Sequence, residues 1–190
     1  MKTTLQHFNP VHFLIAKSRL ILAFGILSQV FISIPFSSFL ITLALLVTLT
    51  FDLMDAYLAR KHKLYSRKLR QYSAQTGLFF WLSVFFYLAF NETEFIQSNM
   101  TLLLILLVLE MGLHLLCYIK FKNHLALNTY AIKVRSVLFV LVVLNRLVGN
   151  EAQIVFNVAF VWTLISQIES FYILIKIKQY RVDVKSVFQL

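Results

Sequence analysis

Two aspartates at the end of an apolar stretch are the residues best placed to do chemistry. Asp52 and Asp55 are three residues apart, so on a helix they share one face, with about 5–6 Å between their Cβ atoms. Two carboxylates at a membrane boundary can hold Mg²⁺ or Mn²⁺, which prefer oxygen ligands completed by water and phosphate. The alternative is that both carboxylates pair with the basic loop that follows, with Arg60 in particular.

The composition indicates that a lipid bilayer surrounds these carboxylates. The 190 residues are 59% hydrophobic and 14% charged, with a mean hydropathy of +0.77, whereas soluble domains are nearer half apolar and a quarter charged. A soluble domain of this length could not bury so much apolar surface. Four glycines, two prolines and the lack of period-2 alternation argue against an all-β fold. We therefore predict an all-α integral membrane protein.

Six apolar stretches are candidates for membrane spans, because a bilayer core needs about 20 apolar residues per helix. They run approximately over residues 12–34, 37–58, 74–90, 100–119, 136–149 with a backward extension, and 154–175. The prediction is a single domain over residues 1–190, with six transmembrane helices and a short N-terminal interfacial segment. The lone Cys117 excludes an intrachain disulfide.

The Lys and Arg residues gather in those segments that are predicted to lie on one side of the membrane. They occur near the N-terminus, in segments 60–70 and 120–135 and in the tail after residue 175, whereas segment 91–99 holds Glu92 and Glu94 with no base. Arg146 is the exception among the 18 Lys and Arg. The positive-inside rule then predicts that both termini are cytosolic. Topology and attraction to anionic headgroups account for the net charge of +10, so we expect membrane lipid and no nucleic acid as partner.

The sequence from Asp52 to Arg60 closely resembles the opening of a family signature. Asp52-x-x-Asp55-Ala56-x-x-Ala59-Arg60 is similar to the start of the CDP-alcohol phosphotransferase motif, D-x-x-D-G-x-x-A-R-x8-G-x3-D-x3-D. Two shorter elements also resemble that family, in the expected order. They are Asn9-Pro10 followed by Ile15-Ala16-Lys17-Ser18-Arg19-Leu20, and Lys133-Val134-Arg135-Ser136 at the start of the fifth stretch.

The resemblance implies a small six-span enzyme of phospholipid synthesis at a bacterial cytoplasmic membrane. Members displace CMP from a CDP-linked lipid or alcohol with the hydroxyl of an acceptor alcohol, using a divalent metal at the cytosolic face. By this resemblance, Asp52 and Asp55 form a partial site for Mg or Mn. It also implies a homodimer or a partner membrane protein, a CDP-linked lipid as ligand, and substrate contacts from Ala56, Ala59, Arg60, Lys133, Arg135 and Ser136.

The second half of the signature is altered in this chain. The glycine position after Arg60 is Leu69, the third aspartate position is Ser73 and the fourth is Gly77. The resemblance implies that the third aspartate is a metal ligand and that the fourth is a ligand or the catalytic base, so the expected base position is Gly77. Loss of a general base alone typically costs a factor of about 10² to 10⁴ in rate. We expect Ser73 and Gly77 to face Asp52 and Asp55 across the second and third spans.

Two functions remain open from the sequence. We favour a catalytically impaired or inactive relative that binds a lipid, a nucleotide or a partner subunit. The alternative is an active phosphotransferase that moves a phosphatidyl or phosphoalcohol group and releases CMP. A separate mid-span pair, Glu110 and His114, could be a proton relay or, as we favour, a satisfied pair that holds spans together.

Overall fold

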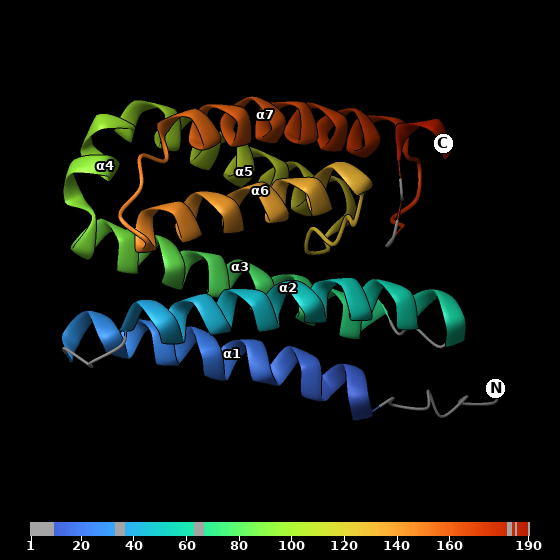
Figure 1. Cartoon of the computed structure of the whole chain (residues 1–190). Coiled ribbons are helices and arrows are strands. Elements are labelled where there is room, and N and C mark those ends of the chain that lie inside the picture. Colours follow the sequence, from blue (N-terminus) through green and yellow to red (C-terminus); the bar gives the residue numbers. More distant parts are fainter. Residues whose placement is uncertain (1–9, 33–36, 63–66, 182–183, 185, 190) are drawn as a thin grey trace. The chain divides into compact units, whose positions relative to one another are not determined.

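A computed structural model of the chain describes residues 10–32, 37–62, 67–181, 184 and 186–189 (Figure 1). All regular secondary structure in these residues is helical. The elements are α1 (Pro10–Phe31), α2 (Ser37–His62), α3 (Arg67–Asn91), α4 (Thr93–Ser98), α5 (Met100–Phe121), α6 (Tyr130–Leu147), α7 (Gln153–Lys176) and the 3-10 turn η1 (Val187–Gln189). The all-α prediction is therefore confirmed. The expected N-terminal interfacial segment precedes Pro10 and lies outside the described residues.

Each predicted apolar stretch corresponds to one long helix. Helix α6 has the backward extension that was expected, and α3 begins at Arg67, several residues before its predicted stretch. Helix α6 begins at Tyr130, where Thr129 Oγ1 accepts a hydrogen bond from the backbone N–H of Ile132 at 3.3 Å. This N-cap fixes where the predicted backward extension of the fifth stretch begins, inside the basic segment 120–135. Helix α3 begins at Arg67, inside the basic segment 60–70 and before the predicted stretch. The basic residues at the start of α3 therefore belong to the helix, which apolar periodicity did not predict.

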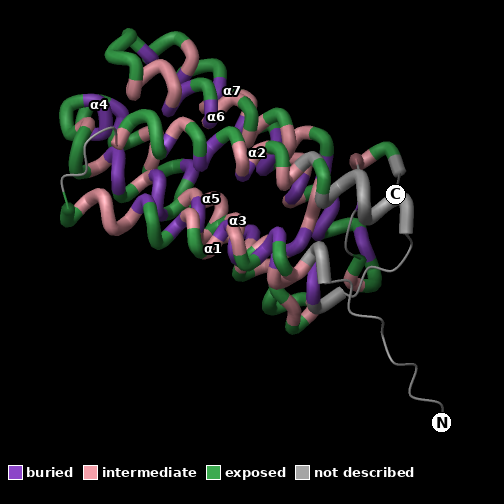
Figure 2. Tube along the Cα trace, turned by 60° about the horizontal axis from the view of Figure 1, so that its bottom comes forward, coloured by how far each residue is buried: buried purple, intermediate pink, exposed green. Residues whose placement is uncertain are grey.

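The chain is a multi-pass integral membrane protein. Among the described residues, four helical segments have the length and composition to cross a membrane: Phe13–Phe31, Leu69–Asn91, Met100–Phe121 and Gln153–Lys176. Large apolar side chains are exposed on these segments, for example Phe24 at 61% and Val108 at 66%. Figure 2 shows buried and exposed positions alternating along the helices. Such exposure is unfavourable in water and is expected against lipid.

The chain packs as two compact units, Met1–Asn91 and Glu92–Leu190. In unit 1, α1 packs mainly against α3 and also contacts α2. The rings of Phe13 and Tyr72 are 5.9 Å apart, and those of Phe24 and Phe79 are 5.4 Å apart, so α1 and α3 run in the same direction.

In unit 2, α7 packs against both α6 and α5. The amides of Asn99 and Gln153 exchange hydrogen bonds of 3.1 and 2.9 Å where α5 and α7 begin. Where the same helices end, Lys120 Nζ donates to the carbonyl of Leu174 at 2.7 Å. Helices α5 and α7 are therefore parallel over their whole length, and polar bonds fix both ends.

Candidate functional site

A buried arginine lies at the centre of unit 1. Arg19 is 2% exposed and follows Ala16 by three residues and precedes Ala23 by four, so all three lie on the buried stripe of α1. The small alanine side chains on either side leave room for the long guanidinium. Its Nη2 lies 2.6 Å from Oδ1 of Asp52, whose side chain is 36% exposed. The first motif aspartate is therefore paired with an arginine from another helix.

Two of the altered motif positions, Ser73 and Gly77, lie against the same guanidinium. Nη1 of Arg19 donates to Oγ of Ser73 at 3.2 Å, and a Cβ placed on Gly77 would lie 4.0 Å from Nη1. Asp52 from α2 and Ser73 and Gly77 from α3 are thus gathered by one side chain of α1. Ser73 and Gly77 were expected to face Asp52 and Asp55. The contacts to Arg19 agree with this for Asp52, and the side chain of Asp55 lies outside the described residues.

Two threonines extend the polar interior around Arg19. Thr48 precedes Asp52 by one helical turn and is 3% exposed, and Thr76 is 3% exposed and donates to the carbonyl of Ser73 at 3.0 Å. Within the described part of the chain, Nε of Arg19 and Oγ1 of Thr48 have no hydrogen-bond partner. Buried polar groups without partners are costly, so the interior of unit 1 is not an optimised apolar core.

The remaining motif residues of α2 are only partly visible. The backbone of Asp55, Ala56, Ala59 and Arg60 belongs to α2, while their side chains lie outside the described residues. Among the residues that the structure describes, no group of three or more His, Cys, Asp or Glu could hold a metal ion. The roles expected for these four residues stay predictions.

In unit 2, Arg135 is paired within the helical bundle. Its Nη1 donates to Oε2 of Glu110 at 2.9 Å, and Nε2 of Gln167 donates to the same oxygen at 3.1 Å. One carboxylate therefore joins α5, α6 and α7. Glu110 is satisfied, as favoured from the sequence, but its hydrogen-bond partners are Arg135 and Gln167, whereas the sequence suggested His114.

Lys133 and Ser136, for which the resemblance also implies substrate contacts, lie on α6 with Arg135. Ser136 Oγ donates to the backbone carbonyl of Ile132 at 3.2 Å, and Lys133 Nζ lies 5.5 Å from the centre of the Tyr130 ring. Since these residues belong to unit 2 and Asp52 belongs to unit 1, their placement in one site stays a prediction.

A second ion pair lies near the other end of unit 2. Arg146 pairs with Glu92, and its guanidinium lies 5.1 Å from the centre of the Phe95 ring. Arg146 is the exception to the charge distribution, and Glu92 lies in the acidic segment 91–99. The sequence pattern does not predict their pairing, because the two residues are 54 positions apart.

The central role of Arg19 was missed, although the sequence contained a signal. An arginine within an apolar stretch is costly unless it is paired, so it marks an interior position with an acidic partner. Arg19 was counted only as a cytosolic charge and as part of a motif. The pairing could be found by asking which acid lies at a similar depth on the next helix, which is Asp52.

Comparisons with protein-family models, curated proteins and solved structures found no match to this chain. The expected family membership therefore stays a prediction that depends on the motif residues themselves.

Proposed function

We propose that this protein is a CDP-alcohol phosphotransferase-like membrane protein of phospholipid metabolism whose catalysis is impaired or lost. In this proposal it has six spans with both termini in the cytosol of a bacterial cell, and it acts by binding a lipid, a nucleotide or a partner subunit. A homodimer belongs to the same proposal. The order of the motif elements and the one-sided distribution of basic residues support it.

The observation that carries the proposal is the guanidinium of Arg19 between Asp52, Ser73 and Gly77. Binding of Mg²⁺ requires enough negative charge to offset the cost of removing water from the ion. The positive charge of Arg19 offsets the negative charge of Asp52. The carboxylate of Asp55 would then have to supply the net negative charge of the metal site. The electrostatics of this site thus support weak binding of a divalent cation.

The site also lacks a base at the position where proton transfer is expected. An acceptor alcohol attacks a phosphate faster when a base removes its proton, and the expected base position is Gly77, which has no side chain. Ser73 cannot take over this role, because a serine hydroxyl is not a base at neutral pH and its oxygen accepts a hydrogen bond from Arg19. The weak metal site and the missing base would both slow the same phosphotransfer reaction.

The first experiment measures CMP release. The purified chain in nanodiscs is incubated with Mn²⁺ or Mg²⁺, CDP-diacylglycerol and a panel of acceptor alcohols, beside the Asp52→Asn variant. We expect no metal-dependent release above that of the variant. Metal-dependent release that disappears in Asp52→Asn would establish the active phosphotransferase instead. Binding of CDP-diacylglycerol without release supports a ligand-binding role, and absence of both leaves the partner-subunit role.

The second experiment restores the missing carboxylates. A variant with Ser73→Asp and Gly77→Asp adds two negative charges beside Arg19, so we expect Mn²⁺ binding, measured by electron paramagnetic resonance, to become clearly stronger. The matched control adds two aspartates elsewhere, with Ser28→Asp and Ser98→Asp. If the first variant binds Mn²⁺ no better than the control, the assigned register of the altered motif is wrong. Circular dichroism checks that both variants keep their helices.

A further inference from the structure

The described residues beyond α7 pack back on α5 and α7 within unit 2. Ile177 and Val184 are 6% and 8% exposed. They belong to one buried apolar cluster with Leu113 and Cys117 of α5 and Ile173 and Leu174 of α7. We call residues 177–189 the C-terminal clip, of which residues 177–181, 184 and 186–189 are described. Its two buried side chains make it part of the core of unit 2.

Hydrogen bonds hold the clip at two further points. The hydroxyl of Tyr180 donates to the carbonyl of His124 at 2.7 Å, and the Tyr180 ring lies 5.8 Å from that of Phe121. The backbone N–H of Val187 donates to Oε1 of Glu169 at 3.2 Å. These contacts lie on both sides of Arg181. The described parts of the clip are therefore held by α5, α7 and the loop after α5.

The clip lies where two membrane spans end. Helices α5 and α7 are both long and apolar enough to cross a membrane, and they end at Phe121 and Lys176. Lys120 Nζ donates to the carbonyls of Leu174 and Ile175, both at 2.7 Å, which places the two ends side by side. The end of a span lies at the level of the lipid headgroups, so the clip is at that level too.

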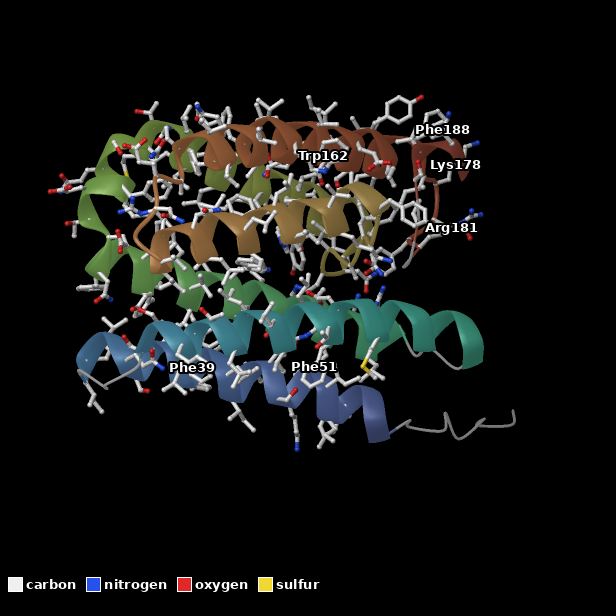
Figure 3. The ribbon with its side chains drawn as sticks, in the orientation of Figure 1. Phe39, Phe51, Trp162, Lys178, Arg181 and Phe188 are labelled. Atoms are coloured by element: carbon white, nitrogen blue, oxygen red, sulfur yellow. The ribbon has the colours of Figure 1, made fainter. Side chains whose placement is uncertain are left out.

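The clip presents cations and one aromatic ring outward. Lys178 and Arg181 are exposed, as is Lys176 at the end of α7, and Phe188 of η1 is 97% exposed. Figure 3 shows Lys178, Arg181 and Phe188 beyond the end of α7. Within the described part of the chain, Lys178 and Arg181 make no ion pair with an acidic side chain. This surface is therefore complementary to a negatively charged partner.

We infer that the C-terminal clip is a binding surface for anionic phospholipid. Lys178 and Arg181 contact the lipid phosphate, for which the guanidinium offers paired donors. Phe188 enters the boundary between headgroups and acyl chains, where an exposed apolar side chain gains contact with lipid. Because the clip is packed on α5 and α7, these groups are held together, unlike those of a loose basic tail. This inference goes beyond the proposed function and needs no CDP-linked ligand.

The test is a titration of the detergent-solubilised full chain with short-chain phosphatidylglycerol. Short-chain phosphatidylcholine is the neutral reference, and inorganic phosphate tests for a simple anion site. We expect phosphatidylglycerol to bind most tightly. Lys178→Gln with Arg181→Gln should weaken it about 30-fold, since each interfacial cation contributes about a factor of five. Inorganic phosphate that binds as tightly as phosphatidylglycerol would overturn the assignment to lipid.

Two further variants separate the clip from net charge and from a flexible tail. Lys2→Gln with Lys17→Gln removes the same charge from unit 1 and should leave the affinity unchanged. An equal loss in this control would mean that overall charge is responsible. Val184→Ser loosens the clip without changing charge, so it should weaken phosphatidylglycerol binding while circular dichroism shows intact helices. Unchanged affinity in Val184→Ser would contradict a role for the packed clip.

Discussion

Two ion pairs, one in each unit, differ in which partner is buried. In unit 1 the side chain of Arg19 is 3% exposed while that of Asp52 is 36% exposed. In unit 2 the side chains of Arg135 and Glu110 are 21% and 23% exposed. Each pair joins three helices, the first through Ser73 and the second through Gln167. Of these two pairs, the one in unit 1 has the more exposed acid.

This difference distinguishes the surroundings of the two arginine–carboxylate pairs. The two side chains of the unit 2 pair are about equally exposed. Glu110 accepts hydrogen bonds from two donors, as expected for a contact that holds helices together. In unit 1 the arginine is buried and the acid is the more exposed partner. Under the proposed function, the Arg19–Asp52 pair is the remnant of a metal site, whereas the Arg135–Glu110 pair joins helices.

The largest expected effect concerns Asp52. Asp52→Ala leaves the Arg19 guanidinium buried without its carboxylate, and breaking a buried pair in this way costs about 3 kcal/mol or more. Arg19→Met leaves an aspartate that is 36% exposed and can reach water or headgroups, so we expect only about 1–2 kcal/mol. The measurement is the free energy of unfolding of each variant from denaturant titration in mixed micelles. Equal losses in the two variants would contradict the asymmetry of the unit 1 pair.

A smaller and symmetrical effect is expected in unit 2. Glu110→Leu and Arg135→Leu should each lower the free energy of unfolding by about 2 kcal/mol, because the two side chains are equally exposed. The double variant should lose less than the sum, since it leaves neither charge unpaired. Strict additivity in this double-mutant cycle would show that the two side chains do not act as a pair.

The smallest expected effect is that of Gln167→Leu. This substitution removes two hydrogen bonds to α5 but leaves the Arg135–Glu110 pair in place. Hydrogen bonds between membrane helices contribute about 0.6 kcal/mol on average, so we expect a loss of about 1 kcal/mol in the same unfolding assay. A loss as large as that of Glu110→Leu would make Gln167, and not Arg135, the main partner of the carboxylate.

Apolar periodicity predicted the long helices well, because the length of a membrane span is imposed by the bilayer. It placed the start of α3 too late, because polar and basic residues continue that helix back to Arg67. Helix α6 begins at Tyr130, and Arg135 is accommodated inside the bundle because Glu110 faces it. A pattern based on apolar residues cannot include a charge whose cost is offset by a partner 25 residues away.

The candidate site was predicted in part. The resemblance to the family signature predicted that Ser73 and Gly77 lie near Asp52, and the structure places all three around the guanidinium of Arg19. The position of Arg19 among these residues could not be predicted by counting along the sequence, because it depends on how α1 packs against α2 and α3. The docking of the C-terminal clip was missed for the same reason, because Val184 and Val187 find their partners only in the folded chain.

The carboxylate of Glu110 also has a consequence for the order of synthesis. Its partners Arg135 and Gln167 are made 25 and 57 residues later, so α5 enters the membrane while its central charge is alone. A lone charge at the centre of a span opposes insertion by about 2.5–3.5 kcal/mol, and each leucine favours it by about 0.5 kcal/mol. Helix α5 is the most apolar of the four candidate spans. Its excess of leucine and isoleucine thus lets Glu110 cross into the bilayer before the residues that will neutralise it have left the ribosome.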